Sequence, residues 1–330
     1  MVKVSFLRYL SLLKRKRTLL QGADFTLNKI KRGKSHSQHN RILRKRLDQA
    51  LPYALSAPAM LFVVLFLLVP LGYCFYCSFW RCDYMHFTKF IGLGNYFDTL
   101  TNSDTLKSIG LSFYISFVSL AIALAVGILM ALWINSAKGG FAYVLEIILL
   151  VPWVTSQVVA AMLWKWLLKD ETGLINYLLT RIGWDTVGFL SNKTLAVYSL
   201  IGVMTWRVIG YVMVQMVAGL KAIPKEYDEA GVIDGANKWQ LFWQVRVPQL
   251  KAPMAISAII VALSNLNNVT VPLTMTGGGP GKATTVISIL AYRESFSYYH
   301  FGEASALSIA LCVINFILTV MYVKAVKYEL

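Results

Sequence analysis

The chain has 330 residues, of which 57% are hydrophobic and only 15% are charged, and its formal net charge is +16. Soluble domains carry roughly 25% charged residues, so this composition excludes a single water-soluble core and indicates a membrane protein. Residues 1–50 contain fourteen Lys or Arg against Asp24 and Asp48, which leaves the rest of the chain nearly balanced. A basic segment next to an apolar span is typical of a cytoplasmic flank that touches anionic lipid, so we expect a lipid partner and no nucleic acid.

Within this basic segment, the stretches SFLRYLSLLKRKRTLL and RILRKRLDQAL mix apolar and basic residues as interfacial helices do. A partly disordered basic tail is the alternative that the sequence leaves open. Further along, Cys74 and Cys77 have the spacing of a metal-binding pair. No second pair of ligands follows them, so no metal site is expected.

Six segments are long and apolar enough to cross a hydrocarbon core about 30 Å thick, which needs roughly 20 helical residues. They lie at about 54–80, 108–134, 141–168, 194–220, 252–275 and 304–323. Their apolar runs are continuous rather than alternating, and backbone groups in lipid must bond internally, so helices are expected and strands are not. The predicted fold class is an all-α membrane protein with six transmembrane helices in residues 51–330, preceded by the basic segment 1–50.

The charges of the loops predict an orientation for this bundle. Because the basic segment precedes the first span, the amino terminus is expected in the cytoplasm. Six spans then return the carboxyl terminus to the same side. The loops at about 136–140 and 221–251 fall inside, and those at about 81–106, 169–193 and 276–303 fall outside.

The longest inner loop contains a charged stretch, EYDEAGVIDGANKWQLFWQVRVP, at residues 226–248. Pro224 suits the first turn of a helix, and the acidic residues that follow favour the positive end of the helix dipole. Asp234-Gly235 is a turn pair, after which helical spacing resumes until Pro248 stops it. The stretch predicts two short helices joined by a tight turn, with exposed aromatic side chains that a partner grips. A surface loop with its aromatic residues among lipid headgroups is the alternative.

The same stretch resembles a motif of the membrane subunits of ATP-binding-cassette importers, E-A-A-x3-G-x9-I-x-L-P. Here Glu229-Ala230-Gly231 is followed by Gly235 and, after nine intervening residues, by Val245-Arg246-Val247-Pro248. The departures are glycine for the second alanine and valine for isoleucine and leucine. The stretches KAIPKEYDEAGVIDGA, TMTGGGPGKATTVISILAYRESF and GEASALSIAL are similar to the sugar-importer branch, in particular to the larger membrane subunit of the maltose importer. The resemblance covers about residues 52–325.

This resemblance implies the importer permease fold and a bacterial inner-membrane location, with both termini cytoplasmic. Within a loop at about 222–250, a coupling helix would dock in a groove on a cytoplasmic ATPase dimer. Glu229 would face a basic group there, Gly235 would allow close approach at the turn, and Ala230, Gly231, Asp234 and Pro248 belong to the same element. A second, different permease subunit and an extracytoplasmic solute-binding protein are the other implied partners.

The fifth predicted span gathers four hydrogen-bonding side chains near mid-membrane: Ser264, Asn265, Asn267 and Asn268. Such groups are costly when they face lipid, and they suit the hydroxyls of a sugar. Hydrogen bonding between helices is the alternative. The resemblance to the maltose importer implies that this region touches the sugar, together with an aromatic residue of the fourth span, which is Tyr211 here.

Arg207 lies one helical turn before Tyr211 in the fourth span, so the two share a face. A charged Arg within a span needs an anion, a carbonyl or water. The functional interpretation is that Arg207 meets an acidic substrate, such as a uronic acid oligosaccharide, of which alginate-type importers are an example. An ion pair with Glu146 or a partner subunit, or a place near the outer headgroups, is the alternative.

Energy for transport is not expected to come from this chain. The stretch GGGPGKATT superficially resembles a phosphate loop, but its spacing does not fit one, so ATP and Mg²⁺ are expected on the partner ATPase and no cofactor here. A secondary transporter or channel for a small polar solute is the alternative function. Such a protein is expected to show an inverted repeat or membrane-buried carboxylates, but the sequence shows no clear repeat, and Glu146 is the only acid well inside a predicted span. The spans contain no His and no catalytic cluster, so we expect no enzyme activity.

Overall fold

A computed structural model describes residues 51–53, 55–137 and 140–327, with side chains up to residue 324. The basic segment 1–50, and with it the predicted interfacial helices, lies outside the described residues. Contacts divide the chain into two units, Met1–Gly72 and Tyr73–Leu330. In the described part of the first unit the chain is helical, and the π-helical turn η1 (Val64–Leu68) leads into α2 (Val69–Ser78), which crosses into the second unit.

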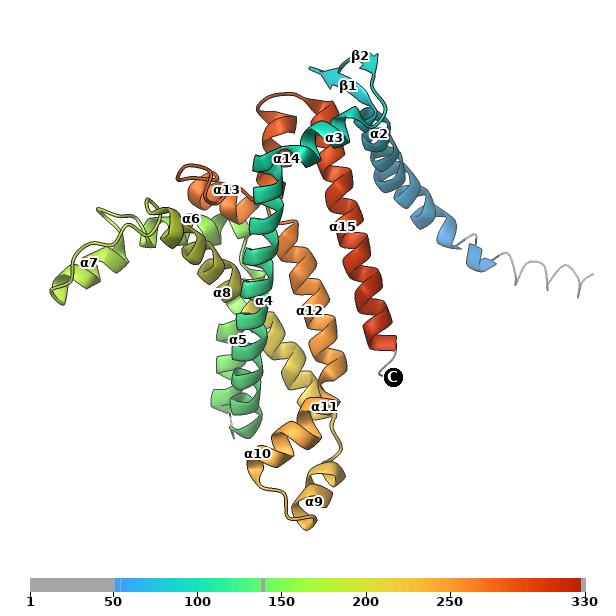
Figure 1. Cartoon of the computed structure of the whole chain (residues 1–330). Coiled ribbons are helices and arrows are strands. Elements are labelled where there is room, and N and C mark those ends of the chain that lie inside the picture. The colour runs from blue at the N-terminus through green and yellow to red at the C-terminus, as the bar shows by residue number, and fades with distance from the viewer. Residues whose placement is uncertain (1–50, 54, 138–139, 328–330) are drawn as a thin grey trace, which may run out of the picture. The chain divides into compact units, whose positions relative to one another are not determined.

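The second unit is a bundle of helices with one small hairpin at one end (Figure 1). After the hairpin strands, its helices follow one another in chain order, interrupted by a second π-helical turn, η2. The elements are β1 (Trp80–Asp83), β2 (His86–Phe90), α3 (Gly94–Thr101), α4 (Ser103–Ser136), α5 (Gly140–Val154), α6 (Gln157–Leu167), α7 (Leu174–Arg181), α8 (Lys193–Ala222), α9 (Lys225–Ile233), α10 (Lys238–Gln240), η2 (Leu241–Arg246), α11 (Val247–Gln249), α12 (Lys251–Leu266), α13 (Thr270–Thr276), α14 (Ile287–Phe296) and α15 (Phe301–Lys327).

Among the described residues, four helices are long and apolar enough to cross a membrane, and the number rises to six if each of two bent helix pairs counts as one span. The four are Leu51–Ser78, Ser103–Ser136, Lys193–Ala222 and Phe301–Lys324, and they coincide with the first, second, fourth and sixth predicted spans. The mainly helical class is confirmed, whereas the count of six depends on how the bent pairs are treated.

The third predicted span is not the continuous helix expected for residues 141–168. It bends by 97° between Gly140–Val154 and Gln157–Leu167. Pro152 lies inside α5, where it removes a backbone hydrogen bond and crowds the preceding turn. Ser156 then takes an extended ψ of 132° before α6 begins, so the helical ladder is interrupted at this point.

The fifth predicted span, about 252–275, is also interrupted, because α12 ends at Leu266 and α13 begins at Thr270. The Oδ1 atom of Asn268 accepts a hydrogen bond from the backbone N–H of Val271 at 2.9 Å. A side chain that binds a backbone N–H in this way offers the chain an alternative to the helical ladder. The asparagines that the sequence places in mid-span therefore lie at a helix break.

The hairpin is the one pair of strands in the described part of the chain, and the sequence did not predict it. β1 pairs antiparallel with β2 from Trp80 opposite Phe90 to Asp83 opposite His86. The two connecting residues, Tyr84 and Met85, both have positive φ, as the tight turns of twisted hairpins require. Aromatic and β-branched residues on a short loop thus form strands outside the apolar spans.

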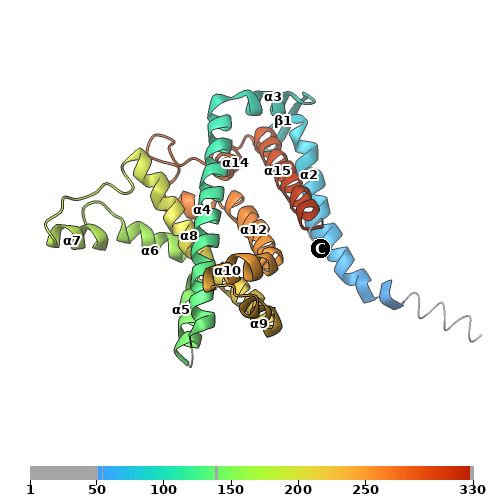
Figure 2. The same cartoon turned by 60° about the horizontal axis from the view of Figure 1, so that its bottom comes forward.

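α8 is the central helix of the second unit. Of the 18 residues that form its most apolar stretch, 67% are buried within the chain, whereas the corresponding share for Phe301–Lys324 is 11%. α4 packs against α8 (Figure 1 and Figure 2) and presents small residues, with Ala123, Gly127 and Ala131 repeating every four positions and Gly127 pressed against Val212. Small residues at such spacing let helix backbones approach closely in membranes, where packing rather than hydrophobic exclusion drives association.

Candidate functional site: a charged helical hairpin and a buried polar network

The charged stretch folds as the two helices and turn that its sequence predicts. α9 begins after Pro224 with Glu226 and Asp228 in its first turn, and Gly235 takes a φ of 83° at the turn. Asn237 then caps the second helical segment through its side chain. Figure 1 shows this loop, α9 to α11, at the end of the second unit opposite the β1–β2 hairpin.

Two contacts fasten the halves of this loop to each other. Arg246 donates from two guanidinium nitrogens to the two carboxylate oxygens of Asp228, at 3.2 and 3.0 Å. Gly231 lies against Leu241, so that a Cβ at position 231 would stand 2.6 Å from the Cδ2 atom of that leucine. The absent side chain at Gly231 therefore lets α9 pack tightly on η2, which makes the loop a single rigid element.

The outer surface of the loop combines charge with exposed apolar groups. Glu229, Ala230 and Asp234 are exposed, as are Ile233 at 84% and Trp239 at 69%. A groove of about 420 Å³ lies beside α9, lined by Asp228, Glu229, Val232 and Ile233. Exposed apolar side chains next to a groove and carboxylates are typical of an interaction surface.

Pro248 lies one residue before the end of the second helical segment, where the sequence predicts the helix to stop. The chain stays helical to Gln249, and then bends by 63° into Lys251–Leu266. The loop is thus joined to the membrane helix α12 almost without a break.

Three membrane helices meet at a buried polar network. Ser119 of α4 accepts hydrogen bonds on its Oγ atom from Thr205 Oγ1 of α8 at 3.1 Å and from Asn265 Nδ2 of α12 at 3.3 Å. All three residues are at most 6% exposed. The helix-to-helix hydrogen bonding that the sequence left open as an alternative is therefore present for Asn265. The sequence prediction missed Ser119 and Thr205, which carry no signal except a small polar side chain in an apolar run.

The other three candidate residues near Asn265 differ in their contacts and in how exposed they are. Asn268 is 6% exposed and caps α13, as described above. Asn267 is exposed; its amide donates to the carbonyl of Leu263 at 2.7 Å and its Oδ1 accepts from Asn315 of α15 at 2.9 Å. Ser264 is half-buried. The four residues thus lie on or beside the break between α12 and α13, and the role in substrate contact stays a prediction.

Arg207 and Tyr211 share one side of α8, as predicted. Arg207 is 6% exposed, and its Nε atom lacks a hydrogen-bond partner among the described residues. Tyr211 stacks on Trp153 of α5 with ring centroids 4.5 Å apart and an interplanar angle of 23°. Its hydroxyl accepts a hydrogen bond from Gln215 at 3.0 Å. The aromatic pair stands beside the bend between α5 and α6.

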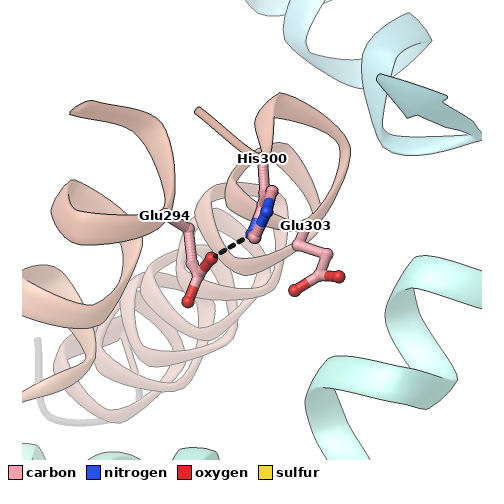
Figure 3. A group of neighbouring side chains, drawn as sticks. All are labelled: Glu294, His300 and Glu303. Atoms are coloured by element: carbon pink, nitrogen blue, oxygen red, sulfur yellow. Dashed lines mark hydrogen bonds and ion pairs between the residues drawn. The ribbon is translucent and has the colours of Figure 1, made fainter. Parts of the chain in front are cut away.

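At the opposite end of the unit, a group of titratable side chains joins α14 to α15 (Figure 3). His300 Nδ1 lies 3.0 Å from Glu294 Oε2, and the ligand atoms of Glu294, His300 and Glu303 lie within 4.8 Å of one another. A cavity of about 620 Å³ reaches both glutamates. Across this cavity Lys282 Nζ contacts Asp104 Oδ2 at 2.6 Å, and this carboxylate raises the pKa of Lys282. The contacts fasten the loops at this end, and the sequence did not predict them.

Taken together, an apolar helical bundle, a rigid charged hairpin at one end and polar groups buried at helix breaks define a multi-pass membrane transport subunit. Residues 123–326 match the family described as the binding-protein-dependent transport system inner membrane component. The chain belongs to this family.

Individual relatives agree in length as well as in sequence. The trehalose/maltose transport system permease protein MalF of Thermococcus litoralis is 30% identical over 289 residues, which cover 86% of this chain and 96% of that protein. The sn-glycerol-3-phosphate transport system permease protein UgpA of Agrobacterium fabrum is 29% identical over 285 residues, covering 85% and 96%. A chain of a solved bacterial ABC transporter that imports the acidic polysaccharide alginate has a TM-score of 0.76 at 23% identity, covering 87% and 98%. That last likeness is one of fold.

Proposed function

We propose that this chain is a permease subunit of an ATP-binding-cassette importer that moves a sugar or oligosaccharide into the cytoplasm. The observation that carries the proposal is the rigid charged hairpin α9–α11, continuous with the membrane helix α12 and matching the importer motif at Glu229, Gly235 and Pro248. The contacts Asp228–Arg246 and Gly231–Leu241 hold the two halves of the loop together. Such a loop would move as one body and transmit the movement of the ATPase to the membrane helices, whereas a flexible loop would not.

The coupling element receives the ATPase on its exposed face. Glu229 lies in the groove beside α9, next to the apolar side chains of Val232 and Ile233. A cationic group on the ATPase would pair with the carboxylate, while the apolar side chains fill a pocket on the partner. Because the segment leads through a single 63° bend into α12, movement of the hairpin shifts the helix that carries Asn265.

The substrate path follows the broken helices. Transporter binding sites are commonly formed where membrane helices are discontinuous, because unwound segments expose polar groups inside the membrane. Here the break after Leu266 holds Asn267 and Asn268, with Ser264 and Asn265 just before it. The bend after Val154 lies beside the Trp153–Tyr211 stack. Amide groups and an aromatic face are the groups that bind sugar hydroxyls and sugar rings.

The proposed partners are the other subunits that such an importer needs. One coupling loop is present per chain, so a second permease subunit of different sequence would supply the other. ATP and Mg²⁺ would be held by a cytoplasmic ATPase dimer, with no cofactor on this chain, and the chain itself would catalyse no reaction. An extracytoplasmic solute-binding protein would deliver the substrate, as in the related structure solved with an alginate pentasaccharide-bound periplasmic protein.

The proposed location is a bacterial inner membrane, with both termini and the loop α9–α11 in the cytoplasm. The hairpin β1–β2 and the loops around α14 would then face the outside. A secondary transporter or channel is the competing function, and the coupling motif, which such proteins do not need, favours the importer.

Purification of the tagged chain from its native membrane, followed by reconstitution in liposomes, tests the function. An ATPase, a second permease and a binding protein should co-purify, and carbohydrate uptake should require ATP on the side of the ATPase. Uptake by the chain alone, driven by a proton or sodium gradient, would instead identify a secondary transporter.

A further inference from the structure

The side chain of Arg207 is a charge buried in the central helix of the bundle. It lies near the middle of α8 and is 6% exposed, between the buried apolar residues Met204 and Val208. A guanidinium in such surroundings is costly unless an anion or several acceptors compensate it, because the apolar interior replaces its hydration with nothing equivalent.

Arg207 has no such compensation in the described part of the chain. Its Nε atom is buried without a hydrogen-bond partner, and the ion pair with Glu146 that the sequence left open is not formed. Two other basic residues of the unit have partners: Arg246 binds Asp228, and Lys165 of α6 donates to the carbonyl of Thr274 at 3.1 Å. Arg207, by contrast, is a buried cation without a counter-ion among the described residues.

The neighbour of Arg207 on the same side of α8 is an aromatic residue. One turn after Arg207, Tyr211 stacks on Trp153 beside the bend between α5 and α6. A guanidinium binds a carboxylate through two parallel hydrogen bonds, and an aromatic face next to it would accept the sugar ring that carries that carboxylate.

We propose that Arg207 binds the acidic group of the transported molecule, so that the substrate is an anionic carbohydrate such as a uronic acid oligosaccharide. This inference rests on the proposed function and adds the charge of its substrate. In the conformation described here Arg207 is enclosed, and the separation of helices during alternating access would open it to the substrate. A carboxylate of the second permease subunit is the competing counter-ion, and the experiment separates the two.

The test uses the reconstituted complex with its binding protein and two probes of equal length. One probe is an oligouronate, and the other is the neutral oligosaccharide obtained by reducing its carboxylates to primary alcohols. Uptake is measured for the wild type and for Arg207→Met. The variant should lose about tenfold or more of its oligouronate uptake, which corresponds to about 1.4 kcal/mol per factor of ten, while uptake of the neutral probe changes less than about threefold. Because the binding protein is the same throughout, any change in the ratio arises in the permease.

Two further variants keep the result interpretable. Arg207→Lys retains the positive charge but cannot form the two parallel hydrogen bonds of a guanidinium. It should therefore show more oligouronate uptake than Arg207→Met and less than the wild type. Lys165→Met removes a cation that is already bonded to a carbonyl and should leave the ratio of the two probes unchanged. Equal losses for both probes, or loss of the second permease from the purified Arg207→Met complex, would overturn the inference and leave the importer function standing. If neither probe nor any other carbohydrate is taken up by the wild type, the proposed function itself fails.

Discussion

Ser119 and Asn265 lie 146 positions apart in the chain and meet through a hydrogen bond of 3.3 Å between the Oγ and Nδ2 atoms. The contact joins α4, the helix with the small-residue stripe, to α12, the helix that continues from the charged hairpin. Thr205 of α8 shares the same serine oxygen. The helices α4, α8 and α12 are therefore bonded to one another at a single serine oxygen.

We expect this network to stabilise the bundle by a modest amount. Ser119→Ala removes the shared acceptor, and hydrogen bonds between membrane helices contribute about 0.6 kcal/mol each, with a maximum near 1.7 kcal/mol. A double-mutant cycle of Ser119→Ala with Asn265→Ala, measured by unfolding in detergent, should give a coupling energy in that range. Strictly additive effects would mean that the two side chains do not interact in the folded protein.

Glu229→Ala should reduce substrate uptake to background and leave ATP hydrolysis unresponsive to the loaded binding protein. The carboxylate lies exposed in the groove beside α9, so its loss would remove the proposed contact to the ATPase without disturbing the fold. Insertion into the membrane and the melting temperature should be unchanged. Uptake and ATP hydrolysis are measured on the reconstituted complex.

Glu226→Ala is the matched control, since it removes the same charge from the first turn of the same helix but outside the groove. It should retain most of the uptake. If Glu229→Ala transports normally, α9 does not dock through that carboxylate.

Gly210→Ala should destabilise the bundle, because α8 touches the backbone of α5 at this glycine. A Cβ at position 210 would stand 2.0 Å from the carbonyl oxygen of Leu149, so the helices must move apart and separate Tyr211 from Trp153. Overpacking of this kind costs about 1–3 kcal/mol, and the melting temperature in detergent should fall. Gly202 on the same helix has open space around it. Gly202→Ala should therefore be neutral or slightly stabilising, and equal effects at the two positions would contradict the close approach.

The thiol of Cys82 should resist alkylation until the pH is high. Cys82 is 2% exposed on β1, and burial raises its pKa to about 11. Because the pKa is raised, the reactive thiolate appears only as the pH rises toward that value, and at pH 8 it amounts to about one part in a thousand. Site-resolved mass spectrometry after brief treatment with iodoacetamide at pH 8 and pH 11 measures this. Denatured protein should label at both values, whereas rapid labelling of the folded protein at pH 8 would contradict the burial.

The sequence by itself determined the class of the protein and the position of its charged helical hairpin, α9–α11. Runs of about 20 apolar residues can only be helices in lipid, and four of the predicted spans coincide with long helices. The hairpin α9–α11 was equally predictable, because Pro224, the acidic first turn and Gly235 act within a few residues of one another. Local rules of this kind need no knowledge of distant segments.

Tertiary structure alone decided where the spans break and which polar groups meet. Pro152 and Pro248 each lie within two residues of the end of a helix, yet the chain bends by 97° after one helix and by 63° after the other, because the surrounding packing determines the direction in which the chain continues. The pairing of Asn265 with Ser119 and the isolation of Arg207 depend on contacts between helices far apart in the chain. A single sequence specifies which groups need partners, but the partners are chosen only when the helices pack.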